Sequence, residues 1–246
     1  MRLDKFLADM GCGTRSDLKN RIRKGQAAVS TPAGLQIIKD PGFQVGEDTE
    51  VMLDGKPVRY LAKVYIMLNK PDGVITATED KREQTVLDMI PAIRKDIFPV
   101  GRLDKDTEGL LLLTNDGELA HRLLSPKHHI DKEYYAVLDK PVSEREVRLF
   151  ADGLDILDEE PFRCLPARLA AVSEGSADDE NKAEVLVTIQ EGKYHQVKRM
   201  FSQVGRQVLY LKRVSMGPLK LDEKLSPGQW RYLTDKEVEE LKGILS

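Results

Sequence analysis

Charged side chains gather at residues 101–108, directly before a block of four leucines, Leu110–Leu113. That block is too short to cross a membrane and predicts a fully buried strand, with Gly109 at its start. Asp104 and Asp106 would then lie at the mouth of a rigid core element. A carboxylate held there can act as a nucleophile or as a base on a bound substrate. A polar turn before a core strand has the same spacing, so spacing alone does not identify an active site.

Four short motifs give a more specific signal. They are Lys70-Pro71-Asp72-Gly73, residues 101–117 (GRLDKDTEGLLLLTNDG), Lys132-Glu133-Tyr134, and residues 191–200 (EGKYHQVKRM). Their residue types and their order resemble those of the motifs in the pseudouridine synthases, in the form found in the RsuA/RluB/E/F group. The resemblance covers nearly the whole chain. It implies an enzyme that breaks the N-glycosidic bond of a uridine in RNA, turns the base and rejoins it to the sugar through carbon.

The resemblance assigns the role of catalytic aspartate to Asp104. One carboxylate at the sugar can serve throughout, as a nucleophile at C1′ or as a base at the neighbouring carbon, and the sequence leaves both open. Asp106 is the rival carboxylate and suits the ordering of a turn. A buried aspartate needs a cation to stay ionised. The resemblance gives this role to Lys198, with Arg199 as the alternative, although many families have arginine at the Lys198 position and lysine lacks its bidentate geometry.

The same resemblance implies how the base is held. Tyr134 matches the tyrosine that stacks on the everted base, as is common in proteins that extrude a base. Alternation along a strand predicts that Tyr134 and Tyr135 point to opposite faces, although both could be ordinary sheet packing. Arg102 resembles an arginine that fills the space of the everted base or contacts RNA. Lys70 and Lys132 could contact phosphate or support the cleft.

The composition is that of an ordinary soluble protein, with 41% hydrophobic and 32% charged residues among 246. No apolar run approaches the ~20 residues that span a bilayer, and the N-terminus lacks the apolar core of a signal peptide. Cys12 and Cys164 suggest free thiols in a reducing cytoplasm. No P-loop, G-x-G-x-x-G or cysteine cluster is present, so we expect no metal and no cofactor.

Basic residues are clustered although the net charge is −3. Between residues 192 and 213 there are six basic residues and no acidic one, and between residues 14 and 25 the only acidic residue is Asp17. Because screening makes local charge matter more than the total, both tracts suit the binding of a phosphate backbone. Helix faces that are merely exposed to solvent would show the same sequence pattern. The predicted RNA contacts are Arg15, Lys19, Arg21, Arg23, Lys24, Arg102, Lys132 and Arg199.

Two domains are predicted. Residues 1–60 read as two short helices, over about 3–10 and 14–25, followed by strands near 28–31, 36–39 and 50–53. This order resembles the alpha-L RNA-binding module of a small-subunit ribosomal protein; a helical dimerisation arm is the alternative. Residues 61–246 form the catalytic domain. Strands and helices without strict alternation predict an α+β fold, and the resemblance implies one central mixed, mostly antiparallel sheet.

Several elements of the second domain are predicted from local signals. Helices are expected over residues 85–90, 118–124, 143–151, 194–204 and 234–241, with caps from Ser143 and Glu146 and from Thr234 and Glu237. Strands are expected near residues 64–68, 110–113, 133–138, 185–190 and 207–213. The acidic stretch Ser173–Lys182 is expected to be a mobile loop.

Three functions remain in competition. The first is a ribosomal RNA pseudouridine synthase. Its target is a uridine in 16S rRNA, because residues 194–200 and His128-His129 resemble the small-subunit branch, whereas large-subunit members more often read R-Q-I-R-R-M. The expected partner is a small-subunit assembly intermediate, and the expected state is a monomer. The second is a non-catalytic RNA-binding assembly factor. The third is a glycoside or nucleoside hydrolase with Asp104 and Asp106 as its carboxylate pair.

Overall fold

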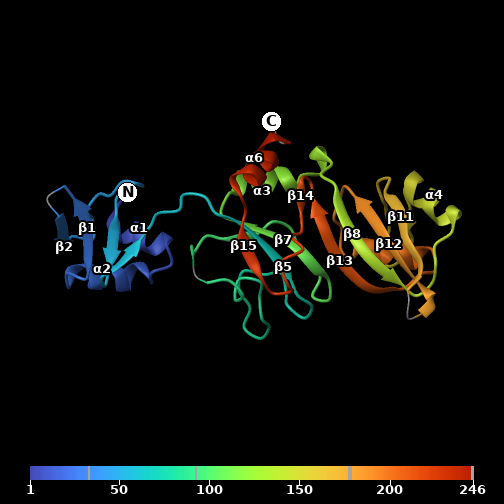
Figure 1. Cartoon of the computed structure of the whole chain (residues 1–246), viewed down its shortest axis with the longest axis horizontal. Helices are drawn as coiled ribbons and strands as arrows, with labels where there is room; N and C mark the ends of the chain where they lie inside the picture. Colours follow the sequence, from blue (N-terminus) through green and yellow to red (C-terminus); the bar gives the residue numbers. More distant parts are fainter. Residues whose placement is uncertain (33, 92, 177–178, 245–246) are drawn as a thin grey trace. The chain divides into compact units, whose positions relative to one another are not determined.

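The computed structural model describes residues 1–32, 34–91, 93–176 and 179–244 (Figure 1). It contains two compact units, Met1–Val64 with Leu87–Phe98 and Tyr65–Val86 with Pro99–Ser246. The first unit therefore includes a segment that returns to it from later in the chain. Arg94 of this segment donates to the Leu61 carbonyl, and the Lys95 amide donates to the Asp9 carbonyl at 3.2 Å.

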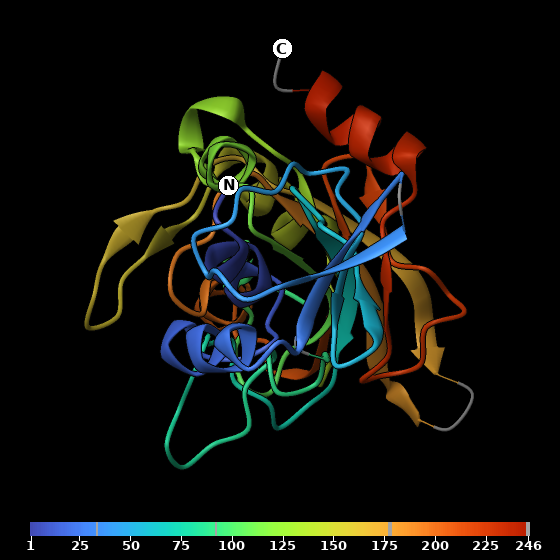
Figure 2. The same cartoon turned by 90° about the vertical axis from the view of Figure 1, so that its left-hand side faces the viewer.

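The N-terminal unit has two helices and a small sheet. Its elements are α1 (Leu3–Asp9), α2 (Arg15–Arg23), β1 (Ala27–Thr31), β2 (Gly34–Ile38), β3 (Val51–Leu53) and β4 (Lys56–Val58). The strands pair in the order β2-β1-β3-β4, and the blue helices α1 and α2 in Figure 2 pack their apolar faces into the same core. Thr14 caps α2, and Asp54-Gly55, both with positive φ, form the β3–β4 turn. The predicted helical and strand pattern is confirmed here.

The second unit is built on one mixed sheet. Its strands are β5 (Tyr65–Lys70), β6 (Phe98–Pro99), β7 (Glu108–Thr114), β8 (Lys132–Leu138), β11 (Arg168–Ser176), β12 (Asp179–Ile189), β13 (Val208–Met216), β14 (Leu219–Lys220) and β15 (Trp230–Tyr232). The order is β11-β12-β8-β13-β7-β5-β15, and among the described residues only β13 and β7 pair in parallel along it. The predicted α+β class with a mostly antiparallel sheet is confirmed.

Short elements flank this sheet. They are α3 (Gly117–Leu124), a 3-10 turn (Pro126–His128), α4 (Glu144–Asp152), the hairpin β9 (Asp155–Ile156) and β10 (Phe162–Arg163), α5 (Gln196–Gln203) and α6 (Asp235–Gly243). Asp116 caps α3, and capping boxes open α4 and α6 as predicted. None of the helices described has the length and the apolar composition to cross a bilayer.

Two local predictions were wrong. Residues 85–90 form an isolated bridge at Thr85 and a turn over 86–89 instead of a helix. The backbone of this segment bonds across to another loop: the Val86 amide donates to the Ile75 carbonyl at 3.1 Å. The stretch 173–182 belongs, outside the undescribed residues 177–178, to the ends of β11 and β12. Antiparallel pairing between these strands satisfies the backbone regardless of the acidic composition.

The capping box of α6 provides a test by pH. Glu237 accepts from the Thr234 amide and holds Arg231 through both carboxylate oxygens, each at 2.8 Å. The hydrogen bond from Arg231 lowers the pKa of Glu237 from 4.5 to about 2. A depressed folded pKa gives stability that is present above pH 4.5 and is lost as the pH falls towards 2. We expect Glu237→Gln to remove up to about 3 kcal/mol of this pH-dependent stability.

Urea unfolding at pH 6, 4 and 3 measures this difference. Glu239→Gln, an exposed glutamate of the same helix, is the matched control and should follow the wild type. Parallel pH curves for wild type and Glu237→Gln would contradict the expectation.

Candidate active site

The loop that carries Asp104 is anchored by two buried polar side chains. The Thr76 hydroxyl donates to the Leu103 carbonyl at 2.7 Å and accepts from the Leu103 amide at 3.2 Å. The Lys70 ammonium donates to the carbonyls of Pro71, Lys105 and Thr107 at 2.9–3.0 Å. Lys70 is fully buried, and burial lowers its pKa to about 8. Of the two predicted roles for Lys70, the structure shows cleft support rather than a surface phosphate contact.

Gly109 lies in β7, just after the Asp104 loop, and allows the close approach of β7 to β13. It has φ +103°, and a Cβ at this position would lie 2.3 Å from the Arg213 carbonyl oxygen and 2.8 Å from its nitrogen. Only glycine fits such an approach without a backbone shift. The buried Arg213 adds a bond from its Nε to the Leu110 carbonyl at 2.8 Å. The parallel pair β7–β13 therefore fixes the strand that follows Asp104.

Two side chains contact the Asp104 carboxylate. Lys198 Nζ lies 3.6 Å from Asp104 Oδ2, and His195 Nε2 lies 3.5 Å from Asp104 Oδ1. Lys198 also donates a hydrogen bond to Asp106 Oδ1, and this bond lowers the pKa of Asp106. One ammonium is thus shared between two carboxylates. The Asp104 side chain is 28% exposed, so it is held in place and still open to a ligand.

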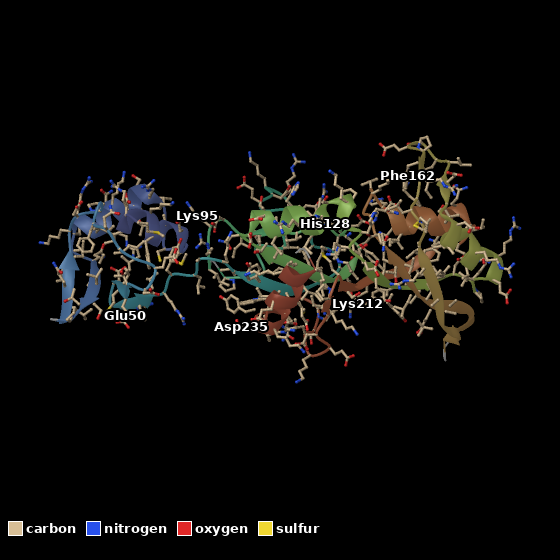
Figure 3. All side chains as sticks on the ribbon, turned by 90° about the horizontal axis from the view of Figure 1, so that it is seen from above. Glu50, Lys95, His128, Phe162, Lys212 and Asp235 are labelled. Carbon is tan, nitrogen blue, oxygen red and sulfur yellow. The ribbon has the colours of Figure 1, made fainter. Side chains whose placement is uncertain are left out.

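Arg199, the alternative partner, points elsewhere. Its guanidinium forms a two-nitrogen ion pair with Asp158 and donates to the Glu160 carbonyl. It also lies 4.6 Å from the centroid of the Phe162 ring, which Figure 3 labels. These contacts within the protein occupy the arginine that was predicted to bind RNA. Between the two candidate cations, the geometry places Lys198 beside Asp104.

A small pocket of about 60 Å³ opens next to the Asp104 carboxylate. Tyr134 lines it and is only 7% exposed, and the exposed Arg102 lies at the same pocket. Tyr135 packs on the opposite face of β8 against Tyr210, with ring centroids 6.1 Å apart. The predicted alternation of the two tyrosines is confirmed. Because the pocket is much smaller than typical ligand sites of about 300–1,000 Å³, side chains must move to admit a base.

Lys132 is buried at the start of β8. It is 8% exposed, and its ammonium donates to the Ile130 carbonyl at 3.2 Å. Burial lowers its pKa. Lys132 starts β8, which lies between β12 and β13 in the sheet, and its ammonium is bonded within the protein, so its RNA contact stays a prediction.

The basic residues of α2 and its C-cap Lys24 divide into two groups. Arg21 donates to the Cys12 carbonyl at 3.1 Å and pairs with Asp54, so it fixes the fold of the N-terminal unit. Arg15, Arg23 and Lys24 are exposed, and Lys19 is half-buried. Arg15 also lies 3.4 Å from the buried Asp4.

His195 is the site residue that the sequence reasoning missed. The motif includes it without giving it a role, yet it is the N-cap of α5, three residues before Lys198. Side chains three apart on a helix are neighbours, so this spacing was the available signal. His195 has φ 48° and ψ 30°, an uncommon conformation for a residue other than glycine, and such outliers cluster at functional sites.

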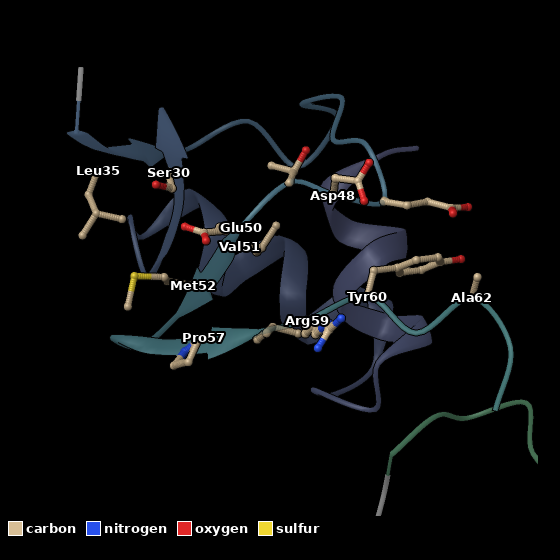
Figure 4. Close-up of a pocket in the computed structure, with 13 residues that line it drawn as sticks. Ser30, Leu35, Asp48, Glu50, Val51, Met52, Pro57, Arg59, Tyr60 and Ala62 are labelled. Atoms are coloured by element: carbon tan, nitrogen blue, oxygen red, sulfur yellow. The ribbon is translucent and has the colours of Figure 1, made fainter. Parts of the chain in front are cut away.

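A larger hollow of about 750 Å³ lies in the N-terminal unit (Figure 4). Its lining includes Asp48, Glu50, Arg59 and Tyr60 and none of the four motifs. With Glu47 as a third carboxylate, its charge would repel a phosphate backbone. Cavity size therefore does not mark the reactive centre of this protein.

The chain matches known proteins along almost its full length. Residues 64–203 match the family model described as RNA pseudouridylate synthase. The uncharacterized RNA pseudouridine synthase YtzG of Bacillus subtilis (strain 168) is 46% identical over 242 residues, 97% of each chain. The ribosomal small subunit pseudouridine synthase A of Vibrio cholerae is 40% identical over 239 residues, covering 97% of this chain and 98% of the relative.

A solved structure extends the likeness to the fold. The crystal structure of a pseudouridylate synthase, 35% identical, superimposes with a TM-score of 0.65 and covers 98% of this chain and 99% of that one. The motifs, the sheet and the matched residues thus agree in sequence and in fold. The chain belongs to the RsuA family of RNA pseudouridine synthases.

Proposed function

We propose that this pseudouridine synthase isomerises a uridine in 16S rRNA, with Asp104 as the reacting carboxylate. The observation that carries the chemistry is the Asp104 carboxylate, set between Lys198 and His195 at a pocket lined by Tyr134. The target rests on small-subunit relatives such as the one from Vibrio cholerae. In this proposal the RNA is presented as a small-subunit assembly intermediate and is bound by a monomer in the cytoplasm.

In the proposed reaction the target uridine leaves its stack and enters the pocket against the Tyr134 ring. Asp104 then acts on the ribose, either as a nucleophile at C1′ or as a base at the neighbouring carbon. The N1–C1′ bond breaks and a C5–C1′ bond forms. N1 gains a proton and the C5 hydrogen is lost to solvent, so the product is an isomer. Both routes use the Asp104 carboxylate, and the Lys198 ammonium lies 3.6 Å from its Oδ2.

The hydrolase alternative fits the site less well. In a carboxylate-pair hydrolase, Asp104 and Asp106 would face one sugar from two sides. Here the Lys198 ammonium contacts both carboxylates, so the two groups lie on one cation instead of on two sides of a sugar. The Asp106 side chain is also 70% exposed, whereas a general acid needs a site that raises its pKa, and that of Asp106 is lowered.

Tritium release tests this proposal directly. Ribosomal RNA labelled with tritium at uridine C5 loses the label when C5 becomes bonded to the sugar. We expect release from 16S rRNA, presented free or in ribonucleoprotein particles, and none from 23S rRNA. Release from 23S rRNA alone would move the target to the large subunit. Tight binding to rRNA without release would favour an assembly factor.

The exposed basic residues of α2 should contribute to RNA affinity. Arg23→Ala with Lys24→Ala should weaken rRNA binding and lower the slope of log K against log salt by about 0.7–0.9 for each phosphate that is no longer bound. Filter binding at four salt concentrations measures the slope. Lys56→Ala, an exposed lysine outside α2, is the control and should leave the slope unchanged. An unaltered slope in the double variant would mean that α2 does not touch phosphate.

A further inference from the structure

Tyr194 presents an exposed aromatic ring beside the active-site pocket. It is 68% exposed, and its ring stacks on that of His195 with centroids 3.8 Å apart and an angle of 20° between the planes. His195 in turn contacts Asp104 at 3.5 Å and lines the pocket. One face of the Tyr194 ring is therefore covered by a site residue, and its exposure leaves the remainder of the ring available to a ligand.

The backbone under this ring is held rigidly. The Tyr194 carbonyl accepts from Arg199 Nη1 at 3.3 Å. The buried Gln196 side chain donates to Glu191 Oε1 at 2.6 Å and so ties the ends of the turn together. His195, in its left-handed conformation, fixes the direction of the turn. A ring already fixed in place loses little conformational freedom when a ligand stacks on it, which favours binding.

The surroundings of the ring suit nucleic acid. Arg102, Lys193 and Lys198 line the same pocket as His195. Single-stranded RNA is bound where cations follow the backbone and aromatic rings stack on bases. Extruding one base from a strand also removes a stacking partner from each of its neighbours. An exposed ring close to the extrusion site can replace that partner.

We propose that Tyr194 binds, by stacking, the base of a nucleotide directly adjacent to the target uridine. Tyr194 is then a substrate-binding residue that contributes to the choice of target without touching the reacting atoms. This inference rests on the proposed function, because it requires that a uridine be everted at Asp104. Stacking tolerates any base, so the interaction should read the presence of an unpaired base rather than its identity.

The test is a thermodynamic cycle in which residue 194 is changed in the protein and one base is removed from the RNA, alone and together. After the modified uridine is mapped, RNAs are made in which each flanking nucleotide in turn lacks its base. Their Kd values are measured by filter binding to Asp104→Asn, which holds the substrate without turnover, and to Asp104→Asn with Tyr194→Ala. The double variant with Tyr194→Phe is the matched control because it keeps an aromatic ring. Thermal unfolding confirms that these surface variants are folded.

We expect one abasic position to raise Kd roughly tenfold when residue 194 is aromatic, as in Asp104→Asn alone or with Tyr194→Phe. With Tyr194→Ala the same position should raise Kd less than about twofold, because the stacking ring is already absent. In turnover assays, Tyr194→Ala should raise KM for intact RNA more than it lowers kcat.

Equal losses of affinity for abasic RNA in all variants would overturn the inference while leaving the synthase assignment intact. Absence of turnover by the wild type on any rRNA would overturn the proposed function, and this inference with it.

Discussion

Replacing Asp104 by asparagine should abolish pseudouridine formation while leaving RNA affinity within a few-fold of the wild type. Asparagine keeps the size of the side chain, so the pocket with Tyr134 retains its shape, but the group that acts on the ribose is removed. Loss of a nucleophile or base of this kind lowers turnover by at least about 10³-fold. Single-turnover tritium release and filter binding on the same RNA measure the two effects separately.

Asp106→Asn is the matched control for this variant. Asp106 carries the same functional group and contacts the same Lys198 ammonium, but its side chain is far more exposed than that of Asp104. Its replacement should lower turnover much less. If Asp106→Asn were inactive and Asp104→Asn active, the roles of the two carboxylates would be reversed.

Gly109→Ala should cost at least about 3 kcal/mol of folding free energy. The new methyl group would lie within 2.9 Å of three atoms of Lys212 and Arg213, two of them backbone, at a φ of +103° that side chains rarely adopt. Relief requires β7 and β13 to separate, and this would also displace the loop that carries Asp104. Urea unfolding measures the loss of stability, and tritium release measures its effect on activity.

Gly117→Ala separates this effect from a general cost of replacing a glycine. Gly117 follows the same strand at its other end and is the first residue of α3, and a Cβ added there would have no described neighbour within 4 Å. Alanine at this position should be neutral or stabilising by up to about 1 kcal/mol. Similar stabilities for Gly109→Ala and Gly117→Ala would show that the close approach to β13 does not constrain the fold.

Local signals allowed much of the fold to be predicted. The pairs Ser143 with Glu146 and Thr234 with Glu237 each act within one helical turn, so a single stretch of sequence holds the whole capping signal. The helix predicted over residues 85–90 was wrong for the opposite reason. Its backbone bonds to residue 75, and the sequence of the segment does not contain its partner.

The residues of the candidate site could be predicted where a sequence motif assigns a role to them. Asp104 and Tyr134 were found because a motif identifies them, and the structure brings them to one pocket. The surroundings of Lys132 and Arg199 could not be predicted, because a basic residue looks the same in sequence whether it faces solvent or the protein. Burial of Lys132 depends on the order of strands in the sheet, and the direction of Arg199 depends on Asp158.

The parallel pairing of β7 with β13 also sets when the enzyme can become active. Gly109 and Leu110 meet Arg213 across a separation of more than a hundred residues, and Lys198 reaches Asp106 across 92. Such distant partners form late and slowly, because a long loop must close first. During synthesis the basic helix α2 emerges well before α5 and β13. The chain can therefore form α2 before the carboxylate at residue 104 has its cation.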